Sequence, residues 1–319
     1  MNELFRDVAG DALCPQGSVV CIGAFDGLHR GHQALVGRAA ARAREQGLPA
    51  VALSFEPLPR EFFAREAPPA RLSLPRSRFE GLRALGADLV GLLRFDARLA
   101  SMEAEAFIAQ VLAQRLSARE VWAGPDFRFG KGRRGDFAML ETQGPEHGFV
   151  ARSIEPVSVD GERVSSSRIR LQLAAGELDG AARALGRRYS LGGRVVYGKQ
   201  LGRKLGYPTA NLRLAGKRPA LGGIFACHVH GVGAAPHPGV ASLGTRPTVF
   251  GTEPLLEAHL FDFDGDLYGQ RIAVEFVAKL RDEEKFDDLP ALVRQMDMDA
   301  EQARRRLRQD SDVTREKSP

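Results

Sequence analysis

The chain has 319 residues, of which 44% are hydrophobic and 27% charged, and its formal net charge is +5 at pH 7. This length is enough for two domains with separate cores, and the composition is that of a soluble globular protein. No run of about 18 apolar residues is present, and the N-terminus lacks the basic start and apolar stretch of a signal peptide, so we expect a cytoplasmic protein without a membrane span.

The cysteine positions argue against two kinds of site, whereas the net charge leaves the kind of ligand open. Cys14, Cys21 and Cys227 form no C-x-x-C pair, which argues against a disulfide framework and against a cysteine zinc site. The basic excess fits either a solvated basic surface or a polyanionic ligand such as ATP or nucleic acid.

The first half of the chain alternates short apolar runs with longer amphipathic ones. The apolar runs predict buried strands and the amphipathic runs predict helices. Strands separated by helices of this length indicate β-α-β units and a parallel sheet. The predicted strands are 19–23, 50–55, 88–93 and 120–123, and the predicted helices are 31–46, 76–85, 102–116, 166–175 and 178–185.

After about Gly186 the pattern changes to short β-rich runs separated by Gly and Pro. Closely spaced short strands predict an antiparallel barrel, which a helix at 289–307 completes. We therefore expect two domains, residues 1–186 and 187–308, and a polar, disordered tail at 309–319. The predicted barrel strands are 193–197, 224–229, 240–243, 256–261 and 272–277.

The segment GAFDGLHRGHQ, Gly23–Gln33, leads from a predicted strand into a predicted helix. Its glycines let the backbone turn sharply and approach a ligand. His29 and His32 are three residues apart and face the same way at a helix start, where backbone N–H groups and the helix dipole favour phosphate. A histidine pair alone is more often structural. Strand, turn, histidines and helix together favour a nucleotide site whose imidazoles stabilise a transferring phosphate.

This segment resembles the HxGH signature of the nucleotidyltransferase superfamily. Three later segments narrow the resemblance to the FMN adenylyltransferase module of bacterial FAD synthetases: FEPLPREFF (Phe55–Phe63), GPDFRFGKGRRGDF (Gly124–Phe137) and VSSSRIRLQLAAGEL (Val164–Leu178). The resemblance implies a Rossmann-like nucleotidyltransferase domain with a parallel sheet.

The same resemblance implies the ligands of this first site. Ser165 and Ser166 precede a helix, where they can cap it and offer N–H groups to a triphosphate. Arg168 or Arg170 can bind phosphate oxygens bidentately. The residues of the turn that we expect to contact the nucleotide are Gly23, Phe25, Asp26 and Gly31.

Asp126 and Phe129 are expected near the flavin, with an aromatic ring as a stacking surface. For Phe127 and Phe129, core packing is nearly as good an explanation. The stretch GKGRRG at 130–135 has the spacing of a dinucleotide fingerprint, but its basic residues predict a mobile loop instead.

A second candidate site lies in VYGKQLGRKLGYPTANL, Val196–Leu212. Its glycines allow backbone N–H groups to surround phosphates. Thr209 and Asn211 are two residues apart, so on an extended chain they point to the same face, and their oxygens are hard ligands that suit Mg²⁺. Taken alone, P-T-A-N is also typical of a turn.

Three further segments follow in order: SLGTRPTVFG (Ser242–Gly251), LEAHLFDFDGDLYG (Leu256–Gly269) and LRDEEKFDDLPAL (Leu280–Leu292). The ordered set resembles bacterial riboflavin kinase, a small antiparallel barrel, over nearly all of residues 187–306. Two departures, Tyr207 for the usual Phe and Ser242 where Asn is common, remove no proposed ligand.

The kinase resemblance places Glu257 on the glutamate that acts as base. In a strand, Glu257 shares a face with His259, while its apolar neighbours point to the other face. The residues implied to bind ATP are Gly198, Gly202, Lys204, Pro208 and Thr209, and those implied to bind the metal are Thr209 and Asn211.

Together the resemblances predict a bifunctional enzyme of flavin biosynthesis that phosphorylates riboflavin to FMN and adenylylates FMN to FAD. ATP, riboflavin, FMN and Mg²⁺ are the expected ligands; no nucleic acid or membrane is expected, and the state is a monomer or weak homo-oligomer. Two alternatives stay open: a different nucleotidyltransferase with a regulatory barrel, and a barrel that binds nucleic acid. P-T-A-N with Glu257 argues against the first, and basic residues clustered at Gly turns argue against the second.

Overall fold

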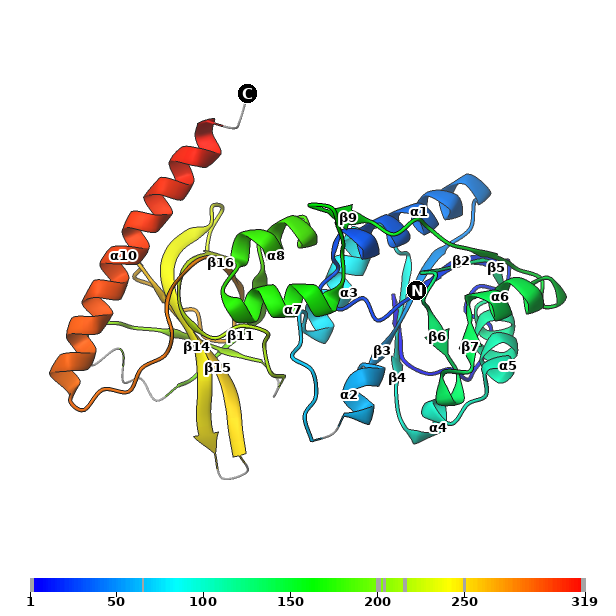
Figure 1. Ribbon diagram of the computed structural model, residues 1–319, viewed down its shortest axis with the longest axis horizontal. Helices are drawn as coiled ribbons and strands as arrows, with labels where there is room; N and C mark the ends of the chain where they lie inside the picture. Colours follow the sequence, from blue (N-terminus) through cyan, green and yellow to red (C-terminus); the bar gives the residue numbers. More distant parts are fainter. Residues whose placement is uncertain are drawn as a thin grey trace. The chain divides into compact units, whose positions relative to one another are not determined.

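The computed structural model describes residues 3–64, 66–198, 202, 205–214, 217–248 and 251–316. The chain divides into two compact units, Met1–Pro69 with Pro75–Ser166, and Ala70–Leu74 with Ser167–Pro319. The first contains a parallel sheet with helices, and the second contains a closed antiparallel barrel and a long C-terminal helix (Figure 1). The predicted fold class is confirmed.

A six-stranded parallel sheet forms the centre of the first unit, in the order β1-β4-β3-β2-β5-β8. β2 (Ser18–Ile22) is buried throughout, and its alternate side chains enter two different core clusters. Helices therefore cover both faces of the sheet, as expected for a parallel sheet. The other strands are β1 (Leu4–Phe5), β3 (Ala50–Glu56), β4 (Leu89–Arg94), β5 (Ala118–Ala123) and β8 (Val150–Arg152).

The helices of the first unit pack on opposite faces of this sheet. α1 (Arg30–Gln46) and α3 (Pro75–Ala84) contribute to one core cluster, whereas α5 (Ala104–Ala106), the π-helix η1 (Phe107–Arg115) and α6 (Phe137–Gln143) contribute to the other. The single helix predicted at 102–116 is thus a short α-helix followed by a π-helix. Shorter elements are α2 (Pro59–Phe63), α4 (Ala97–Ala100), η2 (Lys131–Arg133) and η3 (Pro145–His147), with the hairpins β6 (Arg128–Phe129)/β7 (Gly135–Asp136) and β9 (Ser158–Val159)/β10 (Glu162–Arg163).

The order of the strands locates a crevice. β2 lies between β3 and β5, so the chain leaves the centre of the sheet in one direction after β2 and returns on the other side with β5. Open α/β sheets bind ligands at the carboxyl ends of strands at such a switch point. The predicted His29 segment comes directly after β2, at this edge of the sheet.

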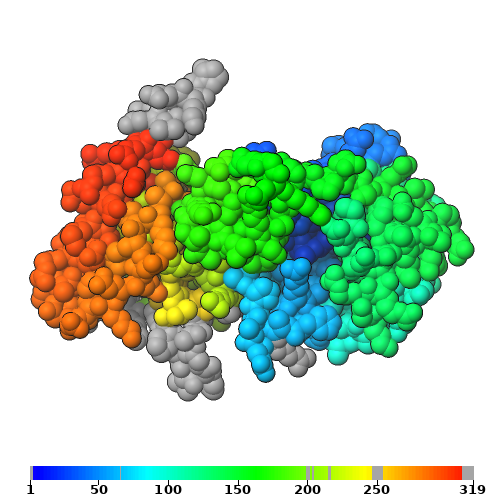
Figure 2. Space-filling model, viewed as in Figure 1, coloured from blue at the N-terminus to red at the C-terminus, as the bar shows by residue number. Residues whose placement is uncertain are grey.

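The barrel of the second unit closes in the order β11-β12-β15-β14-β13-β16, with every described pairing antiparallel. α10 (Leu289–Glu316) packs Ala300, Ala303 and Leu307 against Ala226 and Phe261 of the barrel. Figure 2 shows the outer side of this helix, orange to red, along the barrel. The strands are β11 (Ser190–Val196), β12 (Ala210–Arg213), β13 (Gly223–His230), β14 (His237–Thr248), β15 (Gly251–Leu260) and β16 (Arg271–Arg281).

Two helices, α7 (Ser166–Ala175) and α8 (Leu178–Leu185), precede the barrel. The sequence assigns both to the first domain, whereas all of this region after Ser166 groups with the barrel by its contacts. α10 continues through 309–316, where the sequence predicts disorder, and Arg188 binds Asp310 at 2.7 Å. None of the helices in the described ranges is long and apolar enough to cross a membrane.

Candidate active sites

The turn after β2 has an unusual backbone. The Gly23 N–H donates to the Leu53 carbonyl at 3.1 Å, which continues the pairing of β2 with β3. Phe25 and Leu28 then adopt positive φ angles of 51° and 47° although neither is glycine, and Gly27 has φ 86°. Left-handed conformations cost energy for residues with a Cβ, and such strain is concentrated at functional sites.

His29 caps α1, and the two predicted histidines stack on each other. The His32 N–H donates to His29 Nδ1 at 3.3 Å, and the two rings lie 3.6 Å apart at an interplanar angle of 15°. Phe25 meets the His32 ring edge-on at 5.3 Å. The structure therefore brings both histidines together at the positive end of the α1 dipole, as the sequence predicts.

The His32 imidazole is electrostatically distinctive. Burial lowers its pKa well below the usual range, and the neighbouring His29 lowers it further, so His32 is neutral at pH 7. Its Nδ1 atom is buried and has no hydrogen-bond partner among the residues that the structure describes. A neutral imidazole can still donate one N–H to an anionic oxygen.

Close packing fixes the rest of the turn. A Cβ on Gly31 would lie 3.2 Å from the His29 ring, and one on Gly23 would lie 3.0 Å from the Phe25 ring, so both positions leave little room for a side chain. The Asp26 side chain is buried. The backbone carbonyl of Asp26 accepts a hydrogen bond from Ser166 Oγ at 2.9 Å. Ser166 thus lies against this turn.

Three other predicted ligands, Ser165, Arg168 and Arg170, lie close to Ser166 in the chain. Ser165 is half-buried immediately before α7. Arg168 and Arg170 lie further along α7, in the second unit, where Arg170 Nε donates to the Ala70 carbonyl at 2.6 Å. The assignment of these arginines to a phosphate stays a prediction.

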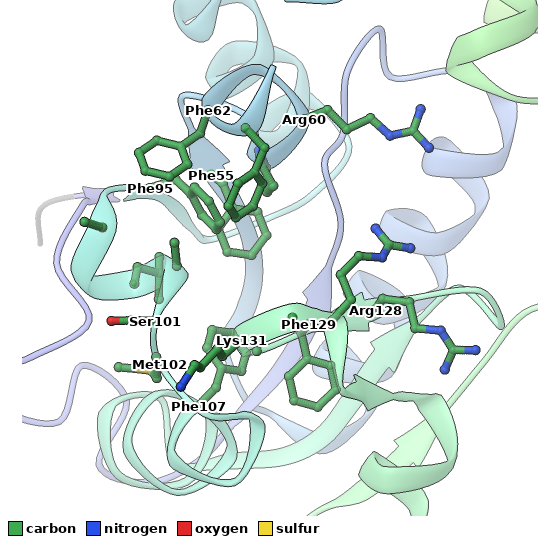
Figure 3. Close-up of a pocket in the computed structure, with 18 of the residues that line it drawn as sticks. Phe55, Arg60, Phe62, Phe95, Ser101, Met102, Phe107, Arg128, Phe129 and Lys131 are labelled. Atoms are coloured by element: carbon green, nitrogen blue, oxygen red, sulfur yellow. The ribbon is translucent and has the colours of Figure 1, made fainter. Parts of the chain in front are cut away.

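An aromatic pocket of about 1100 Å³ opens at the carboxyl ends of β3 and β4, on the same edge of the sheet as His29. Figure 3 shows Phe55, Phe62 and Phe95 grouped together, with Phe107 and Phe129 on the opposite wall. The side chains of Arg60 and Arg128 extend away from these rings on one side of the pocket (Figure 3). The pocket therefore combines flat apolar walls with cationic groups at its margin.

The two residues predicted near a flavin differ in position. Phe129 lines this pocket and also packs in the core, 5.6 Å from Phe107 and stacked at 5.5 Å on Phe127, so core packing is observed and the flavin contact stays a prediction. Asp126 is exposed and forms an ion pair with Arg163 at 2.5 Å. The basic stretch 130–135 closes the β6/β7 hairpin at the margin of the pocket.

The second site is built on the pairing of β12 with β15. Asn211 lies directly opposite Glu257 in this antiparallel ladder. Thr209 Oγ1 donates to Glu257 Oε1 at 3.5 Å, and Asn211 Nδ2 donates to the Thr209 carbonyl at 3.3 Å. As predicted, Glu257 and His259 share the less buried face of β15, between buried apolar neighbours.

Asn211 is the residue of this site with the clearest unmet requirement. Its side chain is 5% exposed, and its Oδ1 atom is buried without a hydrogen-bond partner among the described residues. A buried acceptor of this kind is costly unless a ligand satisfies it. A Cβ on Gly198 would lie 2.6 Å from this oxygen, so glycine is required beside it.

The Gly-rich loop also packs tightly further along. A Cβ on Gly202 would lie 2.2 Å from the Tyr207 carbonyl, which excludes a side chain there. The Pro208 carbonyl lies 2.9 Å from His259 Nδ1. The predicted phosphate ligand Lys204 lies outside the described residues.

Thr209 lines two neighbouring pockets of the barrel unit. One, of about 330 Å³, also contains Glu257, Leu292 and Met296. The other, of about 650 Å³, contains the P-T-A-N residues 208–211 with Gly198. Thr209 therefore lies between the two pockets, and the Glu257 carboxylate that it contacts lines the smaller one.

Sequence reasoning missed several groups of these sites. The segment FEPLPREFF contributes to the family resemblance, but no role is predicted for its rings. Its cluster of Phe residues is a usable signal for the aromatic pocket. Arg281 binds Asp299 of α10 at 2.7 Å and lines the smaller barrel pocket, and Tyr207 donates to Asp297 of the same helix. No sequence signal indicated these contacts, because the partners are distant in the chain.

Residues 11–168 match the family model for FAD synthetase, and residues 185–307 match that for riboflavin kinase. A bifunctional riboflavin kinase/FMN adenylyltransferase from Escherichia coli K12 is 42% identical over 95% of this chain and 97% of its own length. The chain belongs to the bifunctional riboflavin kinase/FMN adenylyltransferase family. Relatives with the same description are 44% identical in Pseudomonas fluorescens, over 91% of this chain and 93% of the relative, and 39% identical in Haemophilus influenzae, over 95% and 98%.

The bifunctional riboflavin kinase/FMN adenylyltransferase family accounts for both halves of the chain. The enzyme phosphorylates riboflavin to FMN and adenylylates FMN to FAD, with ATP as the donor in both reactions. These matches confirm the predicted family and bifunctional activity, and they support neither a regulatory barrel nor a nucleic-acid-binding barrel. A solved structure described as a macrolide-efflux protein from Streptococcus pneumoniae has a TM-score of 0.77 at 30% identity, over 94% of this chain and 98% of that one, and shows the same fold.

Proposed function

We propose that the kinase reaction takes place at Thr209, where the two barrel pockets meet. The buried, unsatisfied Oδ1 of Asn211 beside Thr209 and opposite Glu257 is the observation that carries this proposal. The pocket with Glu257 would hold riboflavin, and the pocket with Gly198 and Asn211 would hold ATP. With the predicted boundary at 186/187, this reaction would belong to residues 187–308.

In the proposed kinase step, Glu257 accepts the proton of the riboflavin 5′-hydroxyl. The hydroxyl oxygen forms a bond to the γ-phosphorus of ATP, the bond to the β–γ bridging oxygen breaks, and ADP leaves. Thr209 donates to Glu257 at 3.5 Å and thereby orients the carboxylate. Backbone groups around Gly198 and Gly202, where no side chain fits, and Lys204 and Pro208 would surround the phosphates.

The side-chain oxygens of Thr209 and Asn211 fit a magnesium ion. Asn211 presents a buried amide oxygen, and Thr209 presents a hydroxyl two residues away. Oxygen donors of this kind, completed by water and phosphate oxygens, are the ligands that Mg²⁺ prefers. When bound, the ion would neutralise charge on the phosphates of ATP.

We further propose that adenylylation takes place at the turn after β2. An oxygen of the FMN phosphate would bond to the α-phosphorus of ATP, and pyrophosphate would leave. That oxygen is already a nucleophile, so no strong base is required. His29, His32 and the start of α1 would stabilise the charge that develops on the transferring phosphate, with Ser165, Ser166 and either Arg168 or Arg170 on the triphosphate.

The aromatic pocket is the proposed site for the flavin of FMN. Phe55, Phe62 and Phe129 offer flat surfaces to the isoalloxazine ring, and Arg60 and Arg128 offer positive charge to the phosphate. Asp126, at the exposed end of the same segment, would contact the flavin only from outside this lining.

We propose a cytoplasmic monomer or weak homo-oligomer that acts on small molecules and binds neither nucleic acid nor membrane. All three cysteines are free and buried, which suits a reducing compartment.

The assignment of Asn211 is tested by titrating Mg²⁺ into wild-type protein and Asn211→Ala while FMN formation from riboflavin and ATP is followed by chromatography. We expect the variant to lose FMN formation or to need far more Mg²⁺, because one oxygen ligand is gone. The same variant supplied with FMN is the control and should form FAD at the wild-type rate. An unchanged Mg²⁺ requirement and rate for FMN formation would refute the proposed metal site.

A further inference from the structure

Arg78 is a fully buried cation in the first unit, and no step above uses it. It lies on α3 with 0% of its surface exposed. Its Nη2 donates to the Phe55 carbonyl at 2.9 Å and to Glu56 Oε2 at 2.6 Å, while Nη1 lies 3.4 Å from the Ala24 carbonyl. One guanidinium therefore joins two chain segments that come from adjacent strands.

These segments carry the two halves of the proposed adenylylation site. Ala24 lies in the turn between β2 and α1, immediately before Phe25, whose ring contacts His32. Phe55 and Glu56 end β3, and the Phe55 ring lines the aromatic pocket (Figure 3). Arg78 thus connects the backbone of the nucleotide turn to the wall of the flavin pocket.

A second buried group supports the same connection. Ser54, on β3, donates through Oγ to the Ala24 carbonyl at 3.0 Å. Two side chains therefore direct hydrogen bonds to one carbonyl of the turn. This carbonyl lies next to Phe25, which holds a strained, positive φ angle, and fixed neighbours are what allow such strain to persist.

The chemistry of arginine suits positioning better than stabilisation. Burying a cation is costly, and apolar residues of similar volume often stabilise a core at least as well as a buried ion pair. The planar guanidinium donates in fixed directions, which a flexible lysine ammonium does not. At this location the fixed directions point at the two segments whose separation determines how a flavin phosphate meets a nucleotide.

We propose that Arg78 is a positioning residue for adenylyl transfer, which holds the turn of His29 and His32 in register with the aromatic wall. This role rests on the proposed functions of that turn and that pocket. Misplacing reacting groups by about 1 Å costs on the order of 10²-fold in rate. We expect the loss in FAD formation alone, since the segments that Arg78 joins by these bonds, Ala24 and Phe55–Glu56, both belong to the first unit.

The main test is Arg78→Lys, which keeps a positive charge beside Glu56 but removes the planar guanidinium and its fixed donor directions. We expect kcat for FAD formation from supplied FMN to fall by about 10- to 100-fold, while the thermal unfolding midpoint stays near that of wild type. Riboflavin phosphorylation by the same sample should not change. Arg76→Lys is the matched control, because Arg76 is exposed on the same helix and pairs with Glu80.

Two further variants separate positioning from folding. Should Arg78→Lys fail to fold, the double variant Arg78→Met with Glu56→Gln removes both charges of the Arg78–Glu56 ion pair. A native unfolding midpoint with reduced kcat then supports positioning. A native midpoint with wild-type kcat overturns it. Ser54→Ala should lower kcat in the same way but less, and decides the matter if neither Arg78 variant folds. A folded Arg78→Lys with wild-type kcat overturns the proposal.

A parallel measurement on His32→Ala distinguishes this failure from failure of the site itself. If His32→Ala is impaired while folded Arg78→Lys is fully active, the positioning role alone is refuted. If folded His32→Ala is fully active, the site assignment is refuted and the role of Arg78 with it.

Discussion

Replacing Glu257 by Gln should remove the proposed base of the kinase reaction while leaving its surroundings intact. The amide has nearly the shape of the carboxylate, and its oxygen can still accept from Thr209 Oγ1, which lies 3.5 Å from Glu257 Oε1. The pairing of Asn211 with residue 257 across β12 and β15 uses the backbone and does not change. The substitution therefore removes the ability to take a proton and little else.

A positioned general base typically contributes about 10²–10⁴ to the rate, which corresponds to about 2.7–5.4 kcal/mol of activation free energy. We expect kcat for FMN formation to fall by this factor, while KM for ATP changes little because Glu257 is not among the lining residues of the pocket proposed for ATP. The rate is measured from riboflavin and ATP, with riboflavin, FMN and FAD separated by chromatography.

Two controls accompany the Glu257→Gln measurement. Supplied with FMN, the variant should still form FAD at the wild-type rate. Glu301→Gln makes the same chemical change at an exposed site on α10, where Glu301 pairs with Arg305, and should leave FMN formation unaffected. A Glu257→Gln variant with near wild-type kcat for FMN formation would remove Glu257 from the mechanism.

The remaining predictions concern His32 and Gly198. His32→Ala should slow FAD formation from FMN by roughly 10²–10³ through loss of a donor to the transferring phosphate, while riboflavin phosphorylation continues and FMN accumulates; loss of both activities in a natively folded variant would indicate one composite site. Because burial holds the pKa of folded His32 well below its unfolded value, the unfolded state binds the extra proton as the pH falls below about 6.5. The thermal unfolding midpoint should therefore fall more between about pH 7 and 5 in wild type than in His32→Gln, and equal falls would contradict the burial of a neutral His32. Gly198→Ala should impair FMN formation but not FAD formation, because its Cβ would lie 2.6 Å from Asn211 Oδ1; kinetics with each flavin supplied separately would show whether it does.

Much of the fold could be predicted because its signals are local. The apolar run at β2 and the recurring buried residues of α1 give the periods of a buried strand and an amphipathic helix. The sequence predicts no strand at β12, because Pro208 and the Asn of P-T-A-N resemble turn residues; the ladders to β11 and β15 hold this segment extended. The predicted boundary at 186/187 follows a change of composition and stays a prediction.

The candidate sites were predictable where neighbouring residues carry the chemistry. His29 with His32, and Thr209 with Asn211, are each within three positions in the chain, so their joint orientation follows from helix or strand geometry. The long-range contacts were not predictable. Arg78 reaches the Ala24 carbonyl 54 positions away, and such a contact depends on the strand order rather than on any local pattern.

The two proposed flavin pockets are lined by side chains of opposite charge. The aromatic pocket is lined by Arg60, Arg128, Lys131 and Arg133, and it has no carboxylate among its lining residues in the described part of the chain. The smaller barrel pocket is lined by the carboxylates of Glu257, Glu283, Glu284 and Asp299, with Arg281 bound to Asp299.

Riboflavin is uncharged, whereas FMN carries a phosphate that is largely dianionic at pH 7. Like charges brought together out of water repel, and opposite charges attract. With the proposed assignments, the carboxylate-lined pocket would disfavour FMN once the phosphate is attached. The aromatic pocket, in which Arg128 pairs with Asp136 and Lys131 with Glu103 outside the lining, would favour FMN over riboflavin. The order of the two reactions is set by their chemistry, because adenylylation needs the phosphate that phosphorylation adds; with the proposed assignments, the charges of the two pockets would also help FMN to leave the barrel pocket and to bind in the aromatic pocket.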